Sequence, residues 1–112
     1  KDLFKTAKGK YVAPSPIEKL FSTSSIVEQV CVIGQGLPSP FAVINLSEYG
    51  KGISKEEIDQ RIDLLKEKVN HQLESFEKLS KIIIANEDWS VENGILTPTM
   101  KIKRNKVEDL YL

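Results

Sequence analysis

Two short turns carry the residues of this sequence whose types and spacing suit chemistry on an anion. One holds Lys8, Gly9 and Lys10 near the start of the chain, and the other holds Lys101 directly after Met100. A glycine lets the backbone approach a ligand closely, and lysine ammonium groups attract phosphate. The first turn is therefore a candidate phosphate contact, although lysines on a solvated turn are the simpler interpretation of the same pattern.

Lys101 lies in residues 94–104, a segment with a different backbone pattern. Alternation along an extended chain would place Met100 and Ile102 on one face and Lys101 on the other. Pro98, just before them, would limit how far the lysine side chain moves. Such a lysine can bridge a carboxylate and a phosphate where negative charge builds up in a transition state. An ordinary surface lysine fits the periodicity equally well.

A basic cluster follows this segment, formed by Lys103, Arg104 and Lys106. We expect a solvated face to explain at least two of the three, with a weak site for anionic lipid or nucleotide phosphate as the alternative. Over the whole chain, 16 Lys and Arg residues balance 16 Asp and Glu residues. This balance argues against a nucleic-acid partner, because nucleic-acid-binding domains usually carry a basic excess.

The other reactive side chains are few. Cys31 lies in an apolar run and is predicted to be a buried thiol that acts as a small hydrophobic residue. His71 is the only histidine, so no metal site is expected. No apolar stretch approaches the roughly 20 residues that a transmembrane helix needs, and the first residues do not resemble a signal peptide.

The elements that position the first turn are predicted at the start of the chain. Residues 3–6 and 11–12 are short β-prone runs on either side of a glycine, which is typical of a hairpin. Ser15 could cap a helix in which Pro16 takes the first position. Glu18 would then complete a capping box with Ser15. The sequence thus predicts a hairpin followed at once by a short helix.

A sheet is predicted from three runs rich in β-branched residues. Residues 26–33 and 41–46 are expected to be neighbouring strands, because the glycines and prolines between them exclude a helix. Residues 81–85 form a third strand, short and apolar enough to be the central one.

Helical periodicity occupies most of the remaining chain. Ser54, with Glu57 as its capping-box partner, begins an amphipathic helix. Its apolar face comprises Ile58, Ile62, Leu65, Val69 and Leu73. A short helical piece is expected at residues 76–79, and Asn105 with Glu108 would cap a final helix. Residues 1–112 therefore predict an α+β domain with an N-terminal β-hairpin and a central three-stranded sheet covered by helices.

The two turns and their flanking residues together resemble one family. Residues 1–6, 9–14 and 17–18 are similar to the hinge and hairpin motif that opens the C-terminal domain of adenylate-forming (AMP-binding) enzymes. Residues 91–104 are similar to the catalytic-lysine motif of the same domain, and the form Thr-Pro-Thr-Met-Lys is similar to the long-chain fatty acid–CoA ligase (acyl-CoA synthetase) branch. Most of the wider family has glycine where this sequence has Met100.

The resemblance implies a role for each motif. Lys101 would be the catalytic lysine that contacts the carboxylate and the α-phosphate during adenylation. Lys103 lies two residues further on, and a shared role with Lys101 is left open. Lys1 falls at the expected hinge, so residues 1–112 would form a lid domain that begins there. The hairpin residues expected to help bind CoA are Lys8, Gly9 and Lys10.

The resemblance also implies an activity for a longer protein. That protein would be an ATP-dependent acid–thiol ligase that converts a fatty acid to an acyl-adenylate and then transfers the acyl group to CoA. ATP, Mg²⁺ and CoA would bind mainly through an N-terminal adenylation domain, so the 112 residues alone should be inactive. The alternatives are an aryl- or amino-acid-activating ligase and a free-standing binding module. The expected location is the cytoplasm, with peripheral membrane contact left open.

Overall fold

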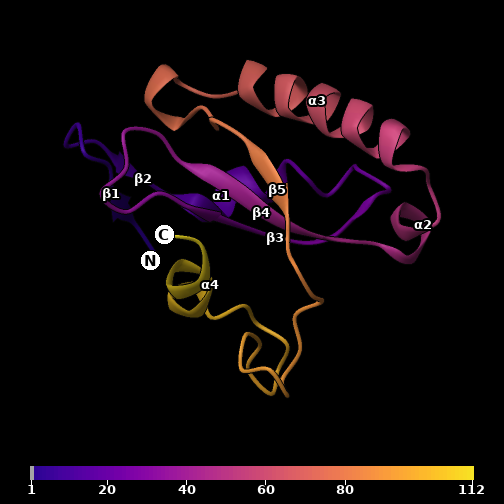
Figure 1. The fold of residues 1–112 in the computed structure, drawn as a ribbon. Coiled ribbons are helices and arrows are strands. Elements are labelled where there is room, and N and C mark those ends of the chain that lie inside the picture. Colours follow the sequence, from indigo (N-terminus) through magenta and orange to yellow (C-terminus); the bar gives the residue numbers. More distant parts are fainter. Residues whose placement is uncertain (1) are drawn as a thin grey trace.

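The computed structural model describes residues 2–112, and the expected hinge residue Lys1 lies outside the described residues. The α+β class is confirmed, with an N-terminal hairpin, a three-stranded sheet and helices around it (Figure 1). The elements in chain order are β1 (Phe4–Lys5), β2 (Tyr11–Val12), α1 (Pro14–Lys19), β3 (Val27–Ile33), β4 (Phe41–Leu46), α2 (Glu48–Lys51), α3 (Lys55–His71), η1 (Ser75–Glu77), β5 (Ile82–Ile84) and α4 (Arg104–Tyr111).

The three strands of the main sheet lie in the order β3-β4-β5. β3 and β4 are antiparallel, as the short loop between them requires, while β5 pairs parallel to β4 after the excursion through α2 and α3. The expectation that residues 81–85 form the central strand is therefore wrong. β4 is central and almost fully buried, whereas β5 is an edge strand in which only Ile82 is buried.

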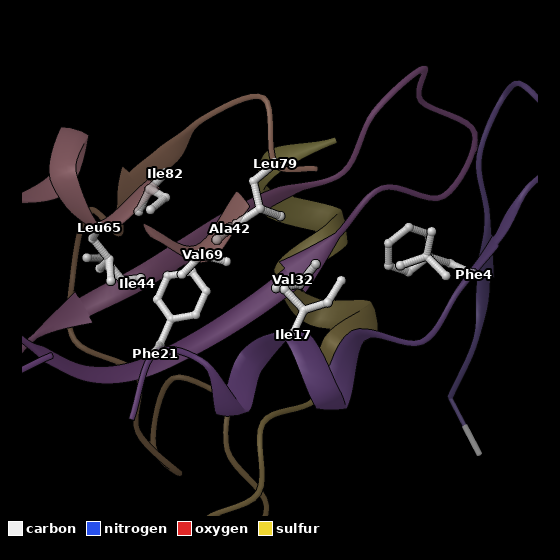
Figure 2. Close-up of a cluster of buried hydrophobic side chains, with 11 residues drawn as sticks. Phe4, Ile17, Phe21, Val32, Ala42, Ile44, Leu65, Val69, Leu79 and Ile82 are labelled. Carbon is white, nitrogen blue, oxygen red and sulfur yellow. The ribbon is translucent and has the colours of Figure 1, made fainter. Parts of the chain in front are cut away.

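Side chains alternate along the strands and build one apolar core on each face of the sheet. Val32, Ala42 and Ile44 point to the face covered by α1 and α3 (Figure 2). Cys31 and Val43 point to the opposite face, which is covered by α4 and the segment before it. Figure 1 shows α3 and α4 on opposite sides of the sheet. The helical cover predicted for the sheet is thus present on both faces.

The long helix α3 begins where it was predicted. The Ser54 hydroxyl accepts a hydrogen bond from the Glu57 N–H at 3.2 Å and so caps the helix. The Glu57 carboxylate does not complete the capping box, because it accepts two hydrogen bonds from Arg61, at 3.0 and 2.8 Å. The apolar stripe is confirmed, since Leu65 and Val69 are buried against the sheet.

The predicted starts of the first and last helices are wrong. α1 begins at Pro14 after Ala13, so Ser15 is not its N-cap. α4 begins at Arg104 after Lys103, so Asn105 is already inside the helix. Neither N-cap residue makes a side-chain capping bond. At the first position of α4, Arg104 makes tertiary contacts with Glu18 and Val32 that the local sequence does not contain.

Two short helical pieces differ from the sequence-based expectation. α2 was not predicted; its N-cap Ser47 accepts the N–H of Gly50 at 3.0 Å. The helical piece expected at residues 76–79 is a single 3₁₀ turn at Ser75–Glu77. Both pieces lie on the connection between β4 and β5, and they give the chain the length it needs to return parallel to β4.

Candidate functional site

Lys101 ends a tight turn that begins at Thr97. The Thr97 N–H donates to the Lys101 carbonyl at 2.8 Å, and the Met100 N–H donates to the Thr97 carbonyl at 2.7 Å. The Lys101 N–H donates to the Thr97 hydroxyl at 3.0 Å. Just outside the turn, Leu96 and Ile102 form an antiparallel bridge. The backbone of Lys101 is therefore held at both its N–H and its carbonyl, while its side chain is exposed.

Met100 adopts a left-handed backbone conformation, with φ of 69°. This region costs an L-residue about 1–2 kcal/mol relative to the right-handed one. A tight turn followed by a left-handed residue is a common way to close a three-residue hairpin loop. The expected extended alternation is consequently interrupted: Met100 is 60% exposed, whereas Ile102 packs against the core. Glycine at this position would avoid the cost.

The hairpin turn is built from the same hydrogen bonds. The Thr6 N–H donates to the Lys10 carbonyl at 2.9 Å, and the Gly9 N–H donates to the Thr6 carbonyl at 3.0 Å. The Lys10 N–H donates to the Thr6 hydroxyl at 3.3 Å. Gly9 takes the left-handed position with φ of 82°. Lys10 therefore occupies the position in this turn that Lys101 occupies in the other.

The two turns present their lysines at separate places. Lys8 and Lys10 are exposed on the hairpin, where the Lys10 ammonium lies 5.6 Å from the centre of the Phe76 ring. Within residues 2–112, Lys101 takes part in no ion pair. Figure 1 shows the β1–β2 hairpin and the segment between β5 and α4 at different parts of the molecule. The domain alone does not bring the candidate site residues together.

Asn93 holds the beginning of the Lys101 segment. Its side-chain carbonyl accepts the N–H groups of Ser90, at 3.0 Å, and Ile95, at 3.3 Å. Its amide NH₂ donates to the Asp88 carbonyl at 2.9 Å. Trp89 and Ile95 are buried in the second core on either side of this network. Asn93 and Gly94 thus lie in a turn that is fixed both by hydrogen bonds and by packing.

Arg104 holds the end of the same segment, and sequence reasoning missed it. Its Nη1 donates to the Glu18 carboxylate at 2.6 Å and to the Val32 carbonyl at 2.9 Å. Glu18 also accepts the Val32 N–H at 2.8 Å, which explains why it forms no capping box. Burial opposes the charge of Arg104, but the hydrogen bond and charge of Glu18 outweigh it and raise the pKa of the guanidinium. Unlike the exposed Lys106, Arg104 is not part of a solvated face.

Cys31 is a buried core residue, as predicted, and accepts a weak hydrogen bond from Arg104 at 3.4 Å. Burial raises the pKa of its thiol to about 12, although the nearby Arg104 charge acts in the opposite direction. Because only the thiolate is a strong nucleophile, this thiol is inert at neutral pH. Its role here is to fill the second core.

The described residues supply cations on rigid turns, and they offer no metal centre. Within residues 2–112, no group of three or more His, Cys, Asp and Glu side chains is placed to hold a metal ion. None of the helices in this range is both long enough and apolar enough to cross a membrane. Exposed ammonium groups on turns with a fixed backbone can attract an anion.

The fold is a small α+β domain that carries exposed lysines on two turns of the same hydrogen-bond pattern. Residues 1–112 match the family described as AMP-binding enzyme C-terminal domain. Since the match covers the whole chain, this chain belongs to that family.

Individual relatives agree with this assignment. Long-chain-fatty-acid–CoA ligase 5 of Rattus norvegicus is 36% identical over 129 residues, an alignment that covers 99% of this chain and 19% of the relative. The A-PCP didomain of a carboxylic acid reductase from Segniliparus rugosus is 29% identical, with a TM-score of 0.71 over 99% of this chain and 16% of that one. The adenylation domain of a carboxylate reductase from Mycobacterium chelonae is 25% identical, with a TM-score of 0.79 over 97% and 18%. The chain thus spans less than a fifth of the length of these relatives.

Proposed function

We propose that this chain is the C-terminal lid domain of a long-chain fatty acid–CoA ligase, an ATP-dependent enzyme that forms AMP. Family membership and the name of the rat relative support the class. In this proposal a larger N-terminal adenylation domain binds most of the fatty acid, ATP and CoA. The lid swings between two positions, one for adenylation and one for thioester formation.

The constrained turn around Lys101 carries this proposal. Adenylation brings a fatty acid carboxylate to the α-phosphate of ATP, and these two anions repel each other. The Lys101 ammonium placed between them would offset the repulsion, and most strongly where the transition state concentrates charge. The bonds from Thr97 fix the lysine backbone, so little backbone freedom remains to be lost when substrate binds.

The hairpin turn supports a separate role in thioester formation. CoA carries phosphate groups, and Lys8 and Lys10 present exposed ammonium groups beside a glycine. A Cβ built on Gly9 would meet no atom within 4 Å, so the backbone there is open to a ligand. Because the two turns lie on different parts of one domain, a rigid-body rotation can exchange one for the other.

In the proposed full-length protein, Mg²⁺ binds to the N-terminal adenylation domain. The side chains of residues 2–112 do not fit a metal ion, so no step of the proposed mechanism in this chain passes through one. The chain's own contribution is positive charge from lysines and, at Gly9, an accessible backbone.

A second candidate is a ligase domain that activates a different carboxylic acid. The solved structures of carboxylic acid reductase adenylation domains favour it, since they match 97–99% of this chain at 25–29% identity. Product analysis of the full-length protein, with long-chain fatty acids and aryl acids as competing substrates, distinguishes the two. Preferential formation of aryl products would overturn the fatty acid assignment.

The test of the proposed function is Lys101→Ala in the full-length protein. We expect ATP–pyrophosphate exchange to fall about 100-fold, the usual scale for losing one transition-state charge contact. Transfer from supplied acyl-adenylate to CoA should change only a few-fold, because the lysine has moved aside at that stage. Lys106→Ala, in the exposed part of the basic cluster, is the matched control. Equal losses in both half-reactions would contradict the assigned role, and a similar loss from Lys103→Ala would show a shared one.

A further inference from the structure

The ion pair between Arg104 and Glu18 is mostly buried and takes no direct part in the proposed chemistry. Only 20% of the Arg104 side chain and 19% of the Glu18 side chain are exposed, and their atoms approach to 2.6 Å. The pair joins residues 86 positions apart in sequence. A shielded pair of this kind is screened weakly by salt, and removing one partner leaves the other charge uncompensated. It is therefore a strong constraint on where α4 begins.

The constraint reaches Lys101 through a short and restrained piece of backbone. Lys101 precedes Arg104 by three positions. Between them, the Lys103 N–H donates to the Ile95 carbonyl at 2.7 Å. Ile102 forms an antiparallel bridge with the residue that precedes the turn. These bonds join residues 95–103 into one connected strip, so we expect a displacement of Arg104 to be transmitted to Lys101.

We infer that Arg104, held by Glu18, is a positioning residue for Lys101. This rests on the proposed function of Lys101 and adds a residue that acts through it without touching substrate. The Nη1 of Arg104 donates to both the Glu18 carboxylate and the Val32 carbonyl, so one end of a planar guanidinium joins α1 and β3. A lysine ammonium would keep the charge, but it would sit at the end of a more flexible stem.

The partner of Arg104 also connects the two lysine turns. Glu18 lies on α1, which follows the β1–β2 hairpin, and its carboxylate is fixed by the Val32 N–H at 2.8 Å. Arg104 also contacts the Asp2 carboxylate, but at 3.7 Å and with 72% of the Asp2 side chain exposed. This second contact therefore adds little to the hold on Arg104. Arg104 thus ties the end of the Lys101 segment to α1, the helix that directly follows the hairpin. The two turns should therefore move as one body.

The test uses the full-length protein with Arg104→Gln, Arg104→Lys and Glu18→Gln. The matched control is Arg61→Gln, which breaks the exposed pair with Glu57 on α3. Three quantities are measured: amide hydrogen exchange in residues 95–103, ATP–pyrophosphate exchange, and transfer from supplied acyl-adenylate to CoA. Each variant is also made in the Lys101→Ala background.

We expect Arg104→Gln to speed amide exchange in the turn about tenfold and to slow adenylation 10- to 100-fold, the scale of a misplaced catalytic group. Transfer to CoA should change less than threefold. Glu18→Gln should act in the same direction, and Arg104→Lys should give a smaller effect in both readouts. In the Lys101→Ala background, Arg104→Gln should cause no further loss of adenylation, since both substitutions remove the same contribution.

Two outcomes would overturn the inference. One is unchanged amide exchange in the turn in all three variants despite lower adenylation. The other is a loss of adenylation that adds fully to that of Lys101→Ala, which would mean that Arg104 acts through something else. A third outcome is that the turn loosens in the Arg104 and Glu18 variants while Lys101→Ala shows normal adenylation. This result would refute the proposed function of Lys101 and leave the structural link from Arg104 to the turn in place.

Discussion

The two lysine turns share one hydrogen-bond pattern and differ in the residue at the left-handed position. In each, a threonine closes the turn with its N–H, carbonyl and hydroxyl, and a lysine follows four residues later. Gly9 fills the left-handed position in the hairpin, whereas Met100 fills it in the C-terminal turn. The same geometry is therefore relaxed in one turn and strained in the other. In the C-terminal turn, hydrogen bonds and flanking contacts maintain the left-handed conformation although Met100 disfavours it.

The turns also differ in what supports them. Phe4 and Val12 anchor the hairpin in the apolar core between the sheet and the helices α1 and α3 (Figure 2). The Lys101 turn also packs on a core, through Leu96 and Ile102, but polar side chains hold both ends of its segment: Asn93 on one side and Arg104 on the other. Apolar packing resists separation but is non-directional, whereas hydrogen bonds set orientation. Directional support fits the role proposed for Lys101, which is to meet two anions at a defined place.

The largest expected effect comes from removing the apolar support of the hairpin. Phe4→Ala should lower the free energy of unfolding of the 112-residue chain by about 3–4 kcal/mol, the usual cost of truncating a buried aromatic residue. Tyr11→Ala is the matched control, because Tyr11 lies on the same hairpin but is 62% exposed. Urea unfolding measures both variants. A loss from Tyr11→Ala as large as that from Phe4→Ala would show that the hairpin is not anchored by its buried face.

A smaller effect is expected from substituting the threonines that close the two turns, Thr6 and Thr97. Thr97→Val and Thr6→Val each remove the same hydroxyl acceptor, and each should cost about 1 kcal/mol of stability. Only Thr97→Val should also lower ATP–pyrophosphate exchange in the full-length protein, by about tenfold, because it loosens the backbone of Lys101. If Thr6→Val lowered adenylation equally, the division of roles between the turns would be wrong.

The smallest expected effect comes from changing the residue at the left-handed position of each turn, Gly9 or Met100. Gly9→Ala should destabilise the chain by about 1 kcal/mol, since a side chain is disfavoured at positive φ. Met100→Gly should stabilise it by about 0.5 kcal/mol, because relief of strain exceeds the added flexibility of the unfolded chain. Thermal unfolding of the two variants measures the difference. Shifts of the same sign would contradict the claim that one turn is strained and the other relaxed.

Features with local causes were predictable. The hairpin follows from a glycine between two β-prone runs, and α3 follows from Ser54 and a regular apolar stripe. The two lysine turns could be located because glycine, proline and asparagine mark turns through their own backbone preferences. The short α2 was missed, since the apolar periodicity that revealed α3 needs more turns than α2 has.

The remaining features depend on contacts between distant residues. Strand order is an example: the apolar run in β5 predicted a central strand, yet β5 lies at the edge, because apolar content reports packing on the sheet faces and not the number of paired neighbours. Glu18 is a second example. Its spacing from Ser15 predicted a capping box, but its hydrogen-bond partners, Val32 and Arg104, come from other elements.

By itself, then, the sequence determined which segments form turns, strands and the long helix, and that Lys101 and the hairpin lysines are the candidates for chemistry. The elements and turns arise from backbone preferences and side-chain periodicity within a few residues, whereas the choice of these lysines rests on the resemblance to adenylate-forming enzymes. Only the tertiary structure decided that Met100 must adopt a positive φ and that the Lys101 turn ends at a buried Arg104. The Met100 conformation closes a three-residue loop whose hydrogen bonds to Thr97 the extended alternation did not predict. The Arg104–Glu18 pair joins residues 86 positions apart, which leaves no spacing pattern along the chain.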